Sequence, residues 1–352
     1  MSLTRKLSVV AATAVLLGGV AACGSSSSSD GEGSAAGSSV SSSGSELVVY
    51  SGRDEDLVDP LIDRIGAGVG VPVEVDYSGN TNAQAAKILE EGDRSPADVF
   101  LGQDAGALGA LDDAGVLAPL PQDILDRVPE QYRGADGTWV ATSARARVLA
   151  YNTDDVQTAD LPTGIDGILD PRWKGKIGYA PTNASFQAFV TGLRVARGDD
   201  GAERWLRAFA ANEPVSFEGN GPLISAVDDG QIAAGLTNHY YFYPYVAEKG
   251  SAASLALHSF DANDPGSLVN VAGVGVLTSA DNQEQAFALV REMLSNSSQQ
   301  YFADETAEYP VIGGITSKYD LPPLPQGASD LDLGQLASLE QTQAMLTKVG
   351  MI

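Results

Sequence analysis

The sequence predicts an α/β protein in which a mainly parallel sheet is flanked by helices, with enough residues for two domains. The first observation is that short apolar segments alternate with helical segments from Glu46 onward, an order typical of parallel sheets with crossover helices. The second is the length of 352 residues. A single core typically stops growing at about 250 to 300 residues, so a chain of this length can form two domains. A hydrophobic fraction of 43% fits a globular protein of this class.

Apolar runs and capping signals place the elements in chain order. The strands expected are 47–50, 71–77, 97–101, 140–151, 177–180, 231–236 and 269–277. A helix over 54–65 begins with three acids, and a helix over 82–91 is closed by Gly92. Asn183 is expected as the N-cap of a later helix, and Pro222 suits the first turn of another. Further helices are expected around Trp205, over 284–294 and at the end of the chain.

The first 45 residues predict export and tethering. Residues 1–22 combine Arg5 and Lys6 with a short apolar run, which reads as a signal peptide because the run is too short for a comfortable membrane span. The ending Val20-Ala21-Ala22-Cys23-Gly24 resembles a bacterial lipobox, which implies cleavage before Cys23 and lipidation of its thiol. The alternative is an ordinary cleaved signal followed by an incidental cysteine. Residues 23–45 are rich in Ser and Gly and are expected to be a flexible tether.

Charge and cysteine content exclude several classes of function. The formal net charge is −25 and no run of Lys or Arg occurs, so binding to nucleic acid is not expected. Cys23 is the single cysteine, which rules out an intramolecular disulfide. The sequence also lacks a nucleophile elbow, a P-loop and a dinucleotide fingerprint, and it contains only two histidines, so we do not expect an enzyme.

The segment from Thr237 to Tyr245 contains four tyrosines and His239. Adjacent tyrosines on a strand point to opposite faces, so Tyr240 and Tyr241 can serve one site only if the strand ends before them. The apolar run 231–236 precedes them, and Pro244 is expected to stop its continuation. The pair would then lie at the carboxyl end of a strand, where α/β sheets bind ligands. The alternative is a packed aromatic cluster without a ligand.

Several segments, taken together and in this order, resemble the ferric-ion-binding proteins of bacterial ABC importers. The resemblance covers residues 46–352 and implies a two-lobed solute-binding fold with a hinge. The segments that carry it are Val49-Tyr50-Ser51-Gly52, residues 90–100, Arg172-Trp173-Lys174-Gly175-Lys176-Ile177-Gly178-Tyr179, Asn238-His239-Tyr240-Tyr241-Phe242-Tyr243, Asp264-Pro265-Gly266-Ser267-Leu268-Val269 and Ala307-Glu308-Tyr309-Pro310-Val311.

The resemblance implies that Tyr240 and Tyr241 bind Fe(III) as phenolates. This suits the ion, because a bound cation of high charge removes protons from groups that otherwise stay neutral. Asp54 stands where many members have a histidine ligand, and it could supply an anionic oxygen or could simply cap a helix. Gln103 stands where some members have a glutamate; it is a poor ligand, so Asp104 or an exogenous anion would complete the shell.

The family also binds a synergistic anion, commonly phosphate or carbonate. The resemblance places it at Asn183, Ala184 and Ser185, with side-chain amides from Asn220 and Asn238. A helix N-terminus offers unpaired N–H groups, although plain helix capping by Asn183 and Ser185 stays open. Arg145 and Arg147 could reach the anion or form ion pairs, and His239 is a further candidate beside the tyrosines.

The implied lobes are 46–146 plus 271–321 and 147–270 plus 322–352. The implied function is the extracytoplasmic binding component of an iron importer, anchored to the outer face of the cell membrane through Cys23. Its partners would be an ABC permease and its ATPase subunit, and we expect a monomer. The alternative function keeps the fold and binds an organic phosphate, a phosphonate or another small anion without metal.

Overall fold

The structure is a computed structural model that describes residues 46–324 and 333–352. The predicted signal peptide, Cys23 and the tether lie outside the described residues. Within the described ranges, none of the helices has the length and apolar character needed to cross a membrane.

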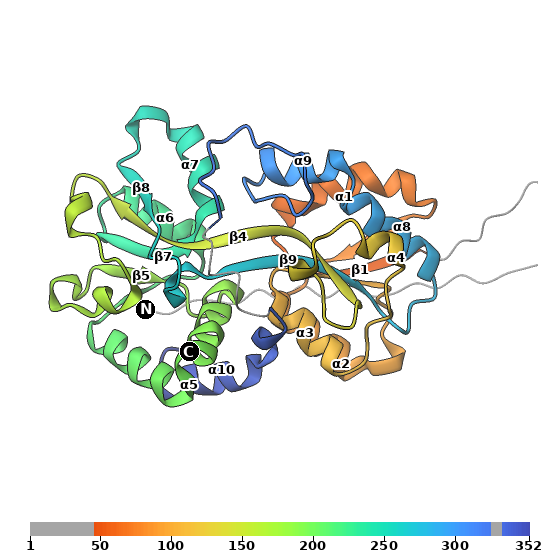
Figure 1. The fold of residues 1–352 in the computed structure, drawn as a ribbon, viewed down its shortest axis with the longest axis horizontal. Coiled ribbons are helices and arrows are strands. Elements are labelled where there is room, and N and C mark those ends of the chain that lie inside the picture. Colours follow the sequence, from red (N-terminus) through yellow and green to blue (C-terminus); the bar gives the residue numbers. More distant parts are fainter. Residues whose placement is uncertain (1–45, 325–332) are drawn as a thin grey trace, which may run out of the picture. The chain divides into compact units, whose positions relative to one another are not determined.

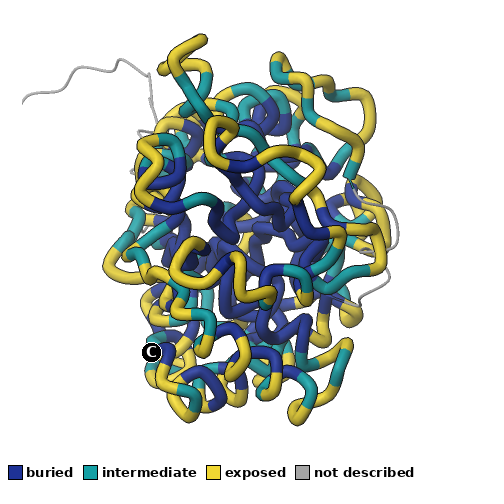
Figure 2. The backbone as a smooth tube through the Cα atoms, turned by 90° about the vertical axis from the view of Figure 1, so that its left-hand side faces the viewer, coloured by how far each residue is buried: buried dark blue, intermediate teal, exposed yellow. Residues whose placement is uncertain are grey.

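Two long strands, β4 (Trp139–Asn152) and β9 (Val269–Val276), run side by side through the middle of the fold (Figure 1). The first part of β4, up to Ala146, pairs with β9 in antiparallel register. From Arg147 onward β4 pairs instead with β7 (Ala234–Asn238) and β8 (Leu255–His258). All residues of β4 and β9 are buried, and Figure 2 shows the buried stretches gathered at the centre of the molecule. The two strands therefore join two groups of elements, which we call lobe 1 and lobe 2.

The sheet order is β2-β1-β3-β9-β4-β7-β5-β6, with β8 paired to β4. In lobe 1, β1 pairs in parallel with both β2 and β3; in lobe 2, β5 pairs in parallel with both β6 and β7. The predicted α/β class is confirmed, and the parallel pairing holds for these outer strands. β4 and β9 run antiparallel to their neighbours because they cross between the lobes instead of returning through a crossover helix.

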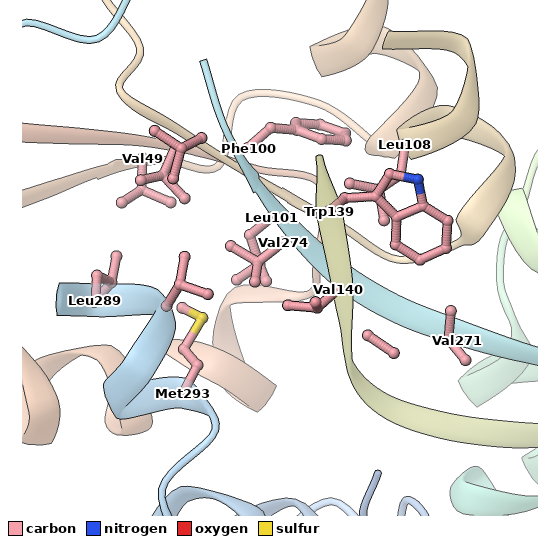
Figure 3. Packing of buried hydrophobic residues seen from close by; sticks show 14 of the residues in the cluster. Val49, Phe100, Leu101, Leu108, Trp139, Val140, Val271, Val274, Leu289 and Met293 are labelled. Atoms are coloured by element: carbon pink, nitrogen blue, oxygen red, sulfur yellow. The ribbon is translucent and has the colours of Figure 1, made fainter. Parts of the chain in front are cut away.

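Lobe 1 packs its helices against the strands around one apolar core, which includes Val49, Phe100, Trp139 and Met293 (Figure 3). Gly92 ends its second helix, as the sequence predicts. Its elements are β1 (Leu47–Ser51), α1 (Glu55–Val69), β2 (Val73–Asp76), α2 (Thr81–Glu91), η1 (Gly92–Arg94), β3 (Val99–Gly102), α3 (Ala105–Asp113), α4 (Gln122–Leu125), η2 (Glu130–Tyr132), α8 (Gln283–Met293) and α9 (Asn296–Asp304).

Lobe 2 has a separate core in which aromatic rings of its first long helix pack together, with Trp205 stacked on Phe209 at 5.0 Å between centroids. That helix, α5 (Ala184–Ala211), is interrupted by Gly198, so it comprises the two helical segments that the sequence predicts. The other elements are η3 (Thr158–Asp160), η4 (Ile165–Leu169), η5 (Pro171–Trp173), β5 (Ile177–Tyr179), β6 (Val215–Ser216), α6 (Asn220–Asp228), η6 (His239–Tyr241), α7 (Phe242–Lys249), η7 (Gly250–Ala252) and η8 (Pro265–Ser267).

The C-terminal residues contact both lobes. The short helix η10 (Leu333–Ala337) places Leu333 and Leu336 in the lobe 1 core. The following helix α10 (Leu339–Lys348) places Met345 and Leu346 in the lobe 2 core. The chain therefore passes from one core to the other near Ser338.

Pro244 lies beyond the end of the strand that precedes the tyrosines. The sequence predicts that Pro244 stops any continuation of that strand; β7 ends earlier, at Asn238, and Pro244 lies in the first turn of α7. A proline is accepted there because the amide hydrogen that it lacks would have no partner within the helix.

Candidate functional site

The paired tyrosines follow directly on the carboxyl end of a central strand. β7 ends at Asn238, the single turn η6 follows, and α7 starts at Phe242. The rings of Tyr240 and Tyr241 stack with centroids 4.4 Å apart and 30° between their planes. The predicted departure from the strand is therefore confirmed, and the turn brings both rings together instead of placing them on opposite faces.

A cleft of about 590 Å³ opens beside the pair and is lined by residues of both lobes. Tyr240, Ser185 and Asn238 lie buried behind this lining. Of the residues that the sequence proposes for the site, the lining includes Asp54, Gln103, Asn183, Ala184, Asn220 and Tyr241. The structure thus brings the two proposed halves of the site, one from each lobe, to a single cavity.

Asp54 faces Tyr241 across this cleft. The Tyr241 hydroxyl donates a hydrogen bond of 3.4 Å to Asp54 Oδ2. Asp54 occupies the N-cap position of α1, but its side chain makes no capping hydrogen bond. Burial, and then the neighbouring Tyr240 and Asp54, raise the pKa of the Tyr241 phenol well above its usual value. Tyr241 is therefore a neutral phenol that points at a carboxylate, and a cation placed between the two would displace its proton.

Gln103 contacts the other tyrosine from lobe 1. Its amide Nε2 donates a hydrogen bond of 3.0 Å to Tyr240 Oη, and both side chains are buried. The backbone N–H of Gln103 donates to Thr81 Oγ1 at 2.9 Å, and that hydroxyl donates to the Gly52 carbonyl at 2.9 Å. A Cβ at Gly52 would overlap the backbone of Thr81, so this close approach requires glycine.

Two helix N-termini meet at the lobe 2 side of the cleft. Asn183 is the N-cap of α5, and its Oδ1 accepts hydrogen bonds from Ser185 N at 3.0 Å and from Asn220 Nδ2 at 3.4 Å. Asn220 is the first residue of α6, and its Oδ1 is buried without a hydrogen-bond partner. The predicted capping role of Asn183 is confirmed, and it leaves the helix N-termini directed at the cavity, an arrangement that favours anions.

Ser185 and Asn238 form a buried pair behind the cleft. Asn238 Nδ2 donates to Ser185 Oγ at 2.9 Å, while Arg147 Nη1 donates to Asn238 Oδ1 at 3.4 Å. Arg147 also donates to the Leu236 carbonyl at 3.0 Å, and it forms no ion pair with a carboxylate of the described ranges. Burial lowers the pKa of Arg147 to about 9.

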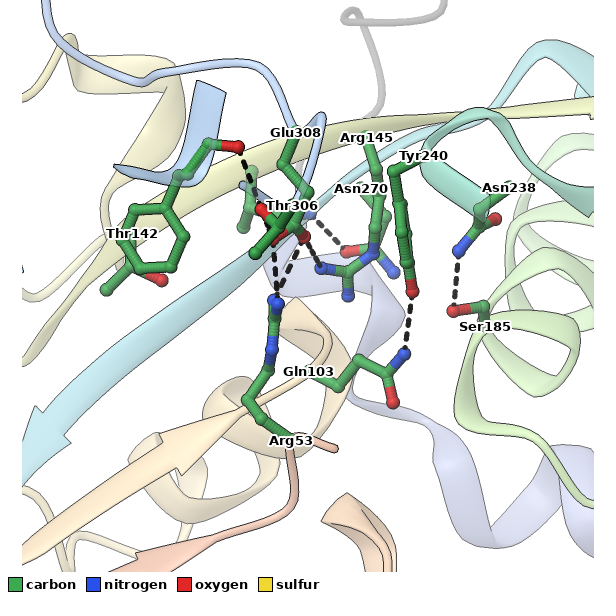
Figure 4. A network of polar contacts seen from close by, with 12 residues as sticks. Arg53, Gln103, Thr142, Arg145, Ser185, Asn238, Tyr240, Asn270, Thr306 and Glu308 are labelled. Atoms are coloured by element: carbon green, nitrogen blue, oxygen red, sulfur yellow. Dashed lines mark hydrogen bonds and ion pairs between the residues drawn. The ribbon is translucent and has the colours of Figure 1, made fainter. Parts of the chain in front are cut away.

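A second buried arginine, Arg145, lies beside Tyr240 in the polar network of Figure 4. Its three guanidinium nitrogens have no hydrogen-bond partner, and its closest carboxylate is Glu308, at 3.7 Å. Glu308 is engaged instead by Arg53, which donates two hydrogen bonds of 3.0 and 2.7 Å. Burial alone would raise the pKa of Glu308, but Arg53 and Arg145 hold it below its usual range.

The network contains more cationic than anionic groups. The buried arginines are Arg53, Arg145 and Arg147, and the buried carboxylates beside them are Glu308 and Asp104. Burial raises the pKa of Asp104, although Arg145 opposes the shift. The side chain of Asp104 caps α3, with Oδ1 accepting from Ala107 N at 3.1 Å, and it does not line the cleft. The surplus positive charge behind the tyrosines favours a phenolate or an exogenous anion at this place.

His239 is buried beside the tyrosines. It is 1% exposed, its Nδ1 accepts a hydrogen bond of 3.2 Å from Ala146 N, and its ring lies 4.6 Å from the ring of Tyr309. Burial lowers the pKa of its imidazole to about 4. The structure thus places His239 in the packing behind the tyrosines and not among the residues that line the cavity.

This buried histidine predicts a loss of stability in acid. The unfolded chain binds a proton at His239 below pH 6.5, whereas the folded chain does so only near pH 4. The free energy of unfolding should therefore fall as the pH drops through this window, by about 2 kcal/mol per 1.5 pH units from this residue alone. Urea unfolding at pH 7 and at about pH 5 measures this loss of stability, and the loss should be smaller in His239→Asn than in the wild type. Equal losses in the variant and the wild type would contradict the prediction.

Sequence reasoning misses three residues of the site: Arg53, Thr81 and Glu308. Arg53 and Glu308 are 255 positions apart, and no local pattern connects them. Glu308 lies in one of the segments that resemble the ferric-binding family, which is its only signal in the sequence. Thr81 gives no signal, because its role depends on the close packing of the loop after β1.

The site differs from a metal centre built on histidine, cysteine and carboxylates. Among residues 46–324 and 333–352, no group of three or more such side chains is placed to hold a metal. A metal in this cleft would depend on the tyrosine oxygens, which are ligands suited to a hard cation of high charge.

Comparison with known proteins places the chain among bacterial solute-binding proteins. The model of the family described as "Bacterial extracellular solute-binding protein" matches residues 94–337. The "Fe(3+)-binding periplasmic protein" of Serratia marcescens is 32% identical over 309 residues, which cover 87% of this chain and 90% of that protein. "Iron uptake protein A2" of Synechocystis sp. is 34% identical over 281 residues, or 76% of this chain and 78% of that protein.

Solved structures agree with this assignment. The crystal structure of iron-bound HitA from Pseudomonas aeruginosa matches with a TM-score of 0.81 and 32% identity, covering 87% of this chain and 99% of that one. The IdiA (FutA) protein of Trichodesmium, in complex with iron and citrate, matches with a TM-score of 0.72 and 28% identity over 88% of this chain and 100% of that one. Both confirm the predicted two-lobed fold.

Proposed function

The chain belongs to the family of bacterial extracellular solute-binding proteins, and from this premise we propose that it captures Fe(III) between its lobes for an ABC importer. The observation that carries the proposal is the stacked Tyr240 and Tyr241 beside a cleft whose opposite wall presents Asp54. The names of the similar proteins support iron over the organic-anion alternative.

The proposed metal ligands are the oxygens of Tyr240, Tyr241 and Asp54. Three anionic oxygens match the charge of Fe(III), and carboxylates and phenolates are the hard donors that such an ion prefers. Since Tyr241 is held as a neutral phenol, iron must displace its proton on binding. Iron binding is therefore expected to release protons and to weaken as the pH falls.

The proposed anion site lies at the N-termini of α5 and α6. Asn183, Ala184 and Asn220 line the cleft there, and the buried pair Ser185 and Asn238 supports them from behind. A phosphate or carbonate bound at this place would fill iron positions that the protein leaves open. The buried guanidinium of Arg145, which makes no hydrogen bond, would add positive charge for the same anion.

The proposed transport cycle uses the two lobes as a clamp. Closure around the ion by bending of β4 and β9 is the motion expected of two-lobed binding proteins. The loaded protein would then pass iron to a membrane permease driven by a cytoplasmic ATPase. We place the protein on the outer face of the cell membrane, held there by a lipid on Cys23.

Absorption spectroscopy tests the proposed function. Purified protein mixed with ferric citrate should develop a visible band, because charge moves from tyrosine phenolate to Fe(III) when the two are bonded. Phosphate and carbonate are varied during the titration to identify the anion. No band under any anion condition, together with tight binding of a phosphate ester, would favour the organic-anion alternative instead.

Replacing Asp54 by Asn tests the third ligand. Asparagine fills the same space and is an equally good N-cap residue, so the stability of α1 should be preserved. The loss of an anionic oxygen should weaken iron retention by at least about 10-fold, as measured by competition with citrate. Glu55→Gln removes the same charge from the neighbouring residue and serves as the control. An unchanged affinity in Asp54→Asn would show that Asp54 is not a ligand.

A further inference from the structure

Gln103 connects the two halves of the cleft through a tyrosine that the proposed function assigns to iron. It follows β3 in lobe 1, and Tyr240 follows β7 in lobe 2. The hydrogen bond of 3.0 Å between Gln103 Nε2 and Tyr240 Oη joins residues 137 positions apart. Gln103 is 6% exposed and Tyr240 is 2% exposed, so water does not compete freely for this bond.

The position of the amide is fixed by the backbone around it. The N–H of Gln103 donates to Thr81 Oγ1, and the Thr81 hydroxyl donates to the carbonyl of Gly52. These bonds tie together the loops that follow β1 and β3 and the start of α2. The side chain of Gln103 therefore extends toward Tyr240 from a rigid support.

The chemistry of the amide suits the contact with the tyrosine oxygen. An amide nitrogen donates to a phenolate oxygen, and an amide oxygen accepts from a neutral phenol after a half-turn of the terminal torsion. An ionised carboxylate at this position would have no hydrogen to donate to the tyrosine and would add a further anionic oxygen beside it. Glutamine thus donates a hydrogen bond to the Tyr240 oxygen without adding a negative charge beside it.

We propose that Gln103 is a positioning residue that donates a hydrogen bond to the Tyr240 phenolate and does not itself bind iron. This inference rests on the proposed function of the cleft. This role accounts for the neutral side chain at position 103, and it means that Gln103 adds no ligand to the iron. The protein supplies three anionic oxygens and leaves the remaining positions to an exogenous anion, so iron retention should depend on that anion.

The first test is Gln103→Leu, measured in the full-length protein loaded with ferric citrate. A hydrogen bond to the phenolate lowers the energy of its donor electrons, so its removal should move the visible band to longer wavelength. Loss of such an outer partner should also weaken iron binding by about 10- to 100-fold. Asn82→Ala is the matched control, because Asn82 donates a hydrogen bond of 2.7 Å to Gln187 across the same two lobes without touching a tyrosine. The control should leave the band in place.

The second test is Gln103→Glu, which places a carboxylate beside the metal. This variant should retain iron after phosphate and carbonate are removed, whereas the wild type should release it. A band that is unshifted in Gln103→Leu, or equal anion dependence in Gln103→Glu and the wild type, would overturn the role of Gln103 while leaving the proposed function intact. The absence of any band in the wild type would overturn the proposed function and this role with it.

Discussion

Replacing both Tyr240 and Tyr241 by Phe is expected to abolish the visible band of the iron-loaded protein. The band requires a phenolate oxygen bonded to Fe(III), and phenylalanine removes both oxygens. The rings themselves stay, so the stacking at 4.4 Å and the packing behind it should be preserved. The affinity for iron should fall by more than the roughly 100-fold that loss of an outer-shell partner causes.

Proton release on iron binding gives a second measurement that compares the wild type with the double variant. The wild type should release protons on iron binding, since the neutral Tyr241 phenol becomes a phenolate, and the double variant should not. Tyr243→Phe is the control, because the ring of Tyr243 packs near His239 and Tyr319 and does not line the cleft. Persistence of the band in the double variant would show that iron binds elsewhere.

Replacing Glu308 by Gln is expected to destabilise the fold strongly. Glu308 is completely buried and receives two hydrogen bonds from Arg53, with Arg145 at 3.7 Å. Without the carboxylate, Arg53 loses its buried ion pair and Arg145 loses its nearest counter-charge, and breaking a buried pair in this way typically costs about 3 to 5 kcal/mol.

Urea unfolding at neutral pH measures this effect. Glu305→Gln is the control, because Glu305 pairs with Lys318 at 3.5 Å on the surface, where such pairs contribute at most about 1 kcal/mol. The folded pKa of Glu308 is held low, so its contribution is present above the unfolded pKa and is lost as the pH falls through the folded value. The difference between Glu308→Gln and the wild type should therefore shrink in strong acid. A difference below about 1 kcal/mol at neutral pH would refute the argument.

Elements with a clear apolar period or a capping residue could be predicted from the sequence. Asn183 marks the start of α5, Gly92 closes α2, and the apolar run of β9 is continuous. The helix α3 gives no such signal, because its Ala- and Gly-rich sequence is buried on nearly all sides. The strand β8 also escapes prediction, since four residues are too few to show a period.

Part of the candidate site could also be predicted from local sequence, and part of it could not. The proximity of Tyr240 to Tyr241 follows from their adjacency and from the end of a strand, which local sequence can indicate. Local sequence cannot identify the hydrogen-bond partners of these tyrosines, because Asp54 lies 187 positions from Tyr241 and Gln103 lies 137 positions from Tyr240. The family resemblance makes Asp54 and Gln103 candidates, and only the folded chain shows what each of them touches.

The C-terminal segment provides a connection between the lobes in addition to β4 and β9, and it should restrict the motion that we propose for them. Arg194 of α5 donates hydrogen bonds to the carbonyl and the hydroxyl of Ser338 at 2.8 and 3.0 Å and to Thr342 Oγ1 at 2.9 Å, where the chain leaves lobe 1 for lobe 2. Two bodies joined only by β4 and β9 could both swing and twist, whereas a third connection at a separate place suppresses the twist. We expect the proposed opening to be a rotation about one line, which would return the tyrosines and Asp54 to the same alignment at each closure.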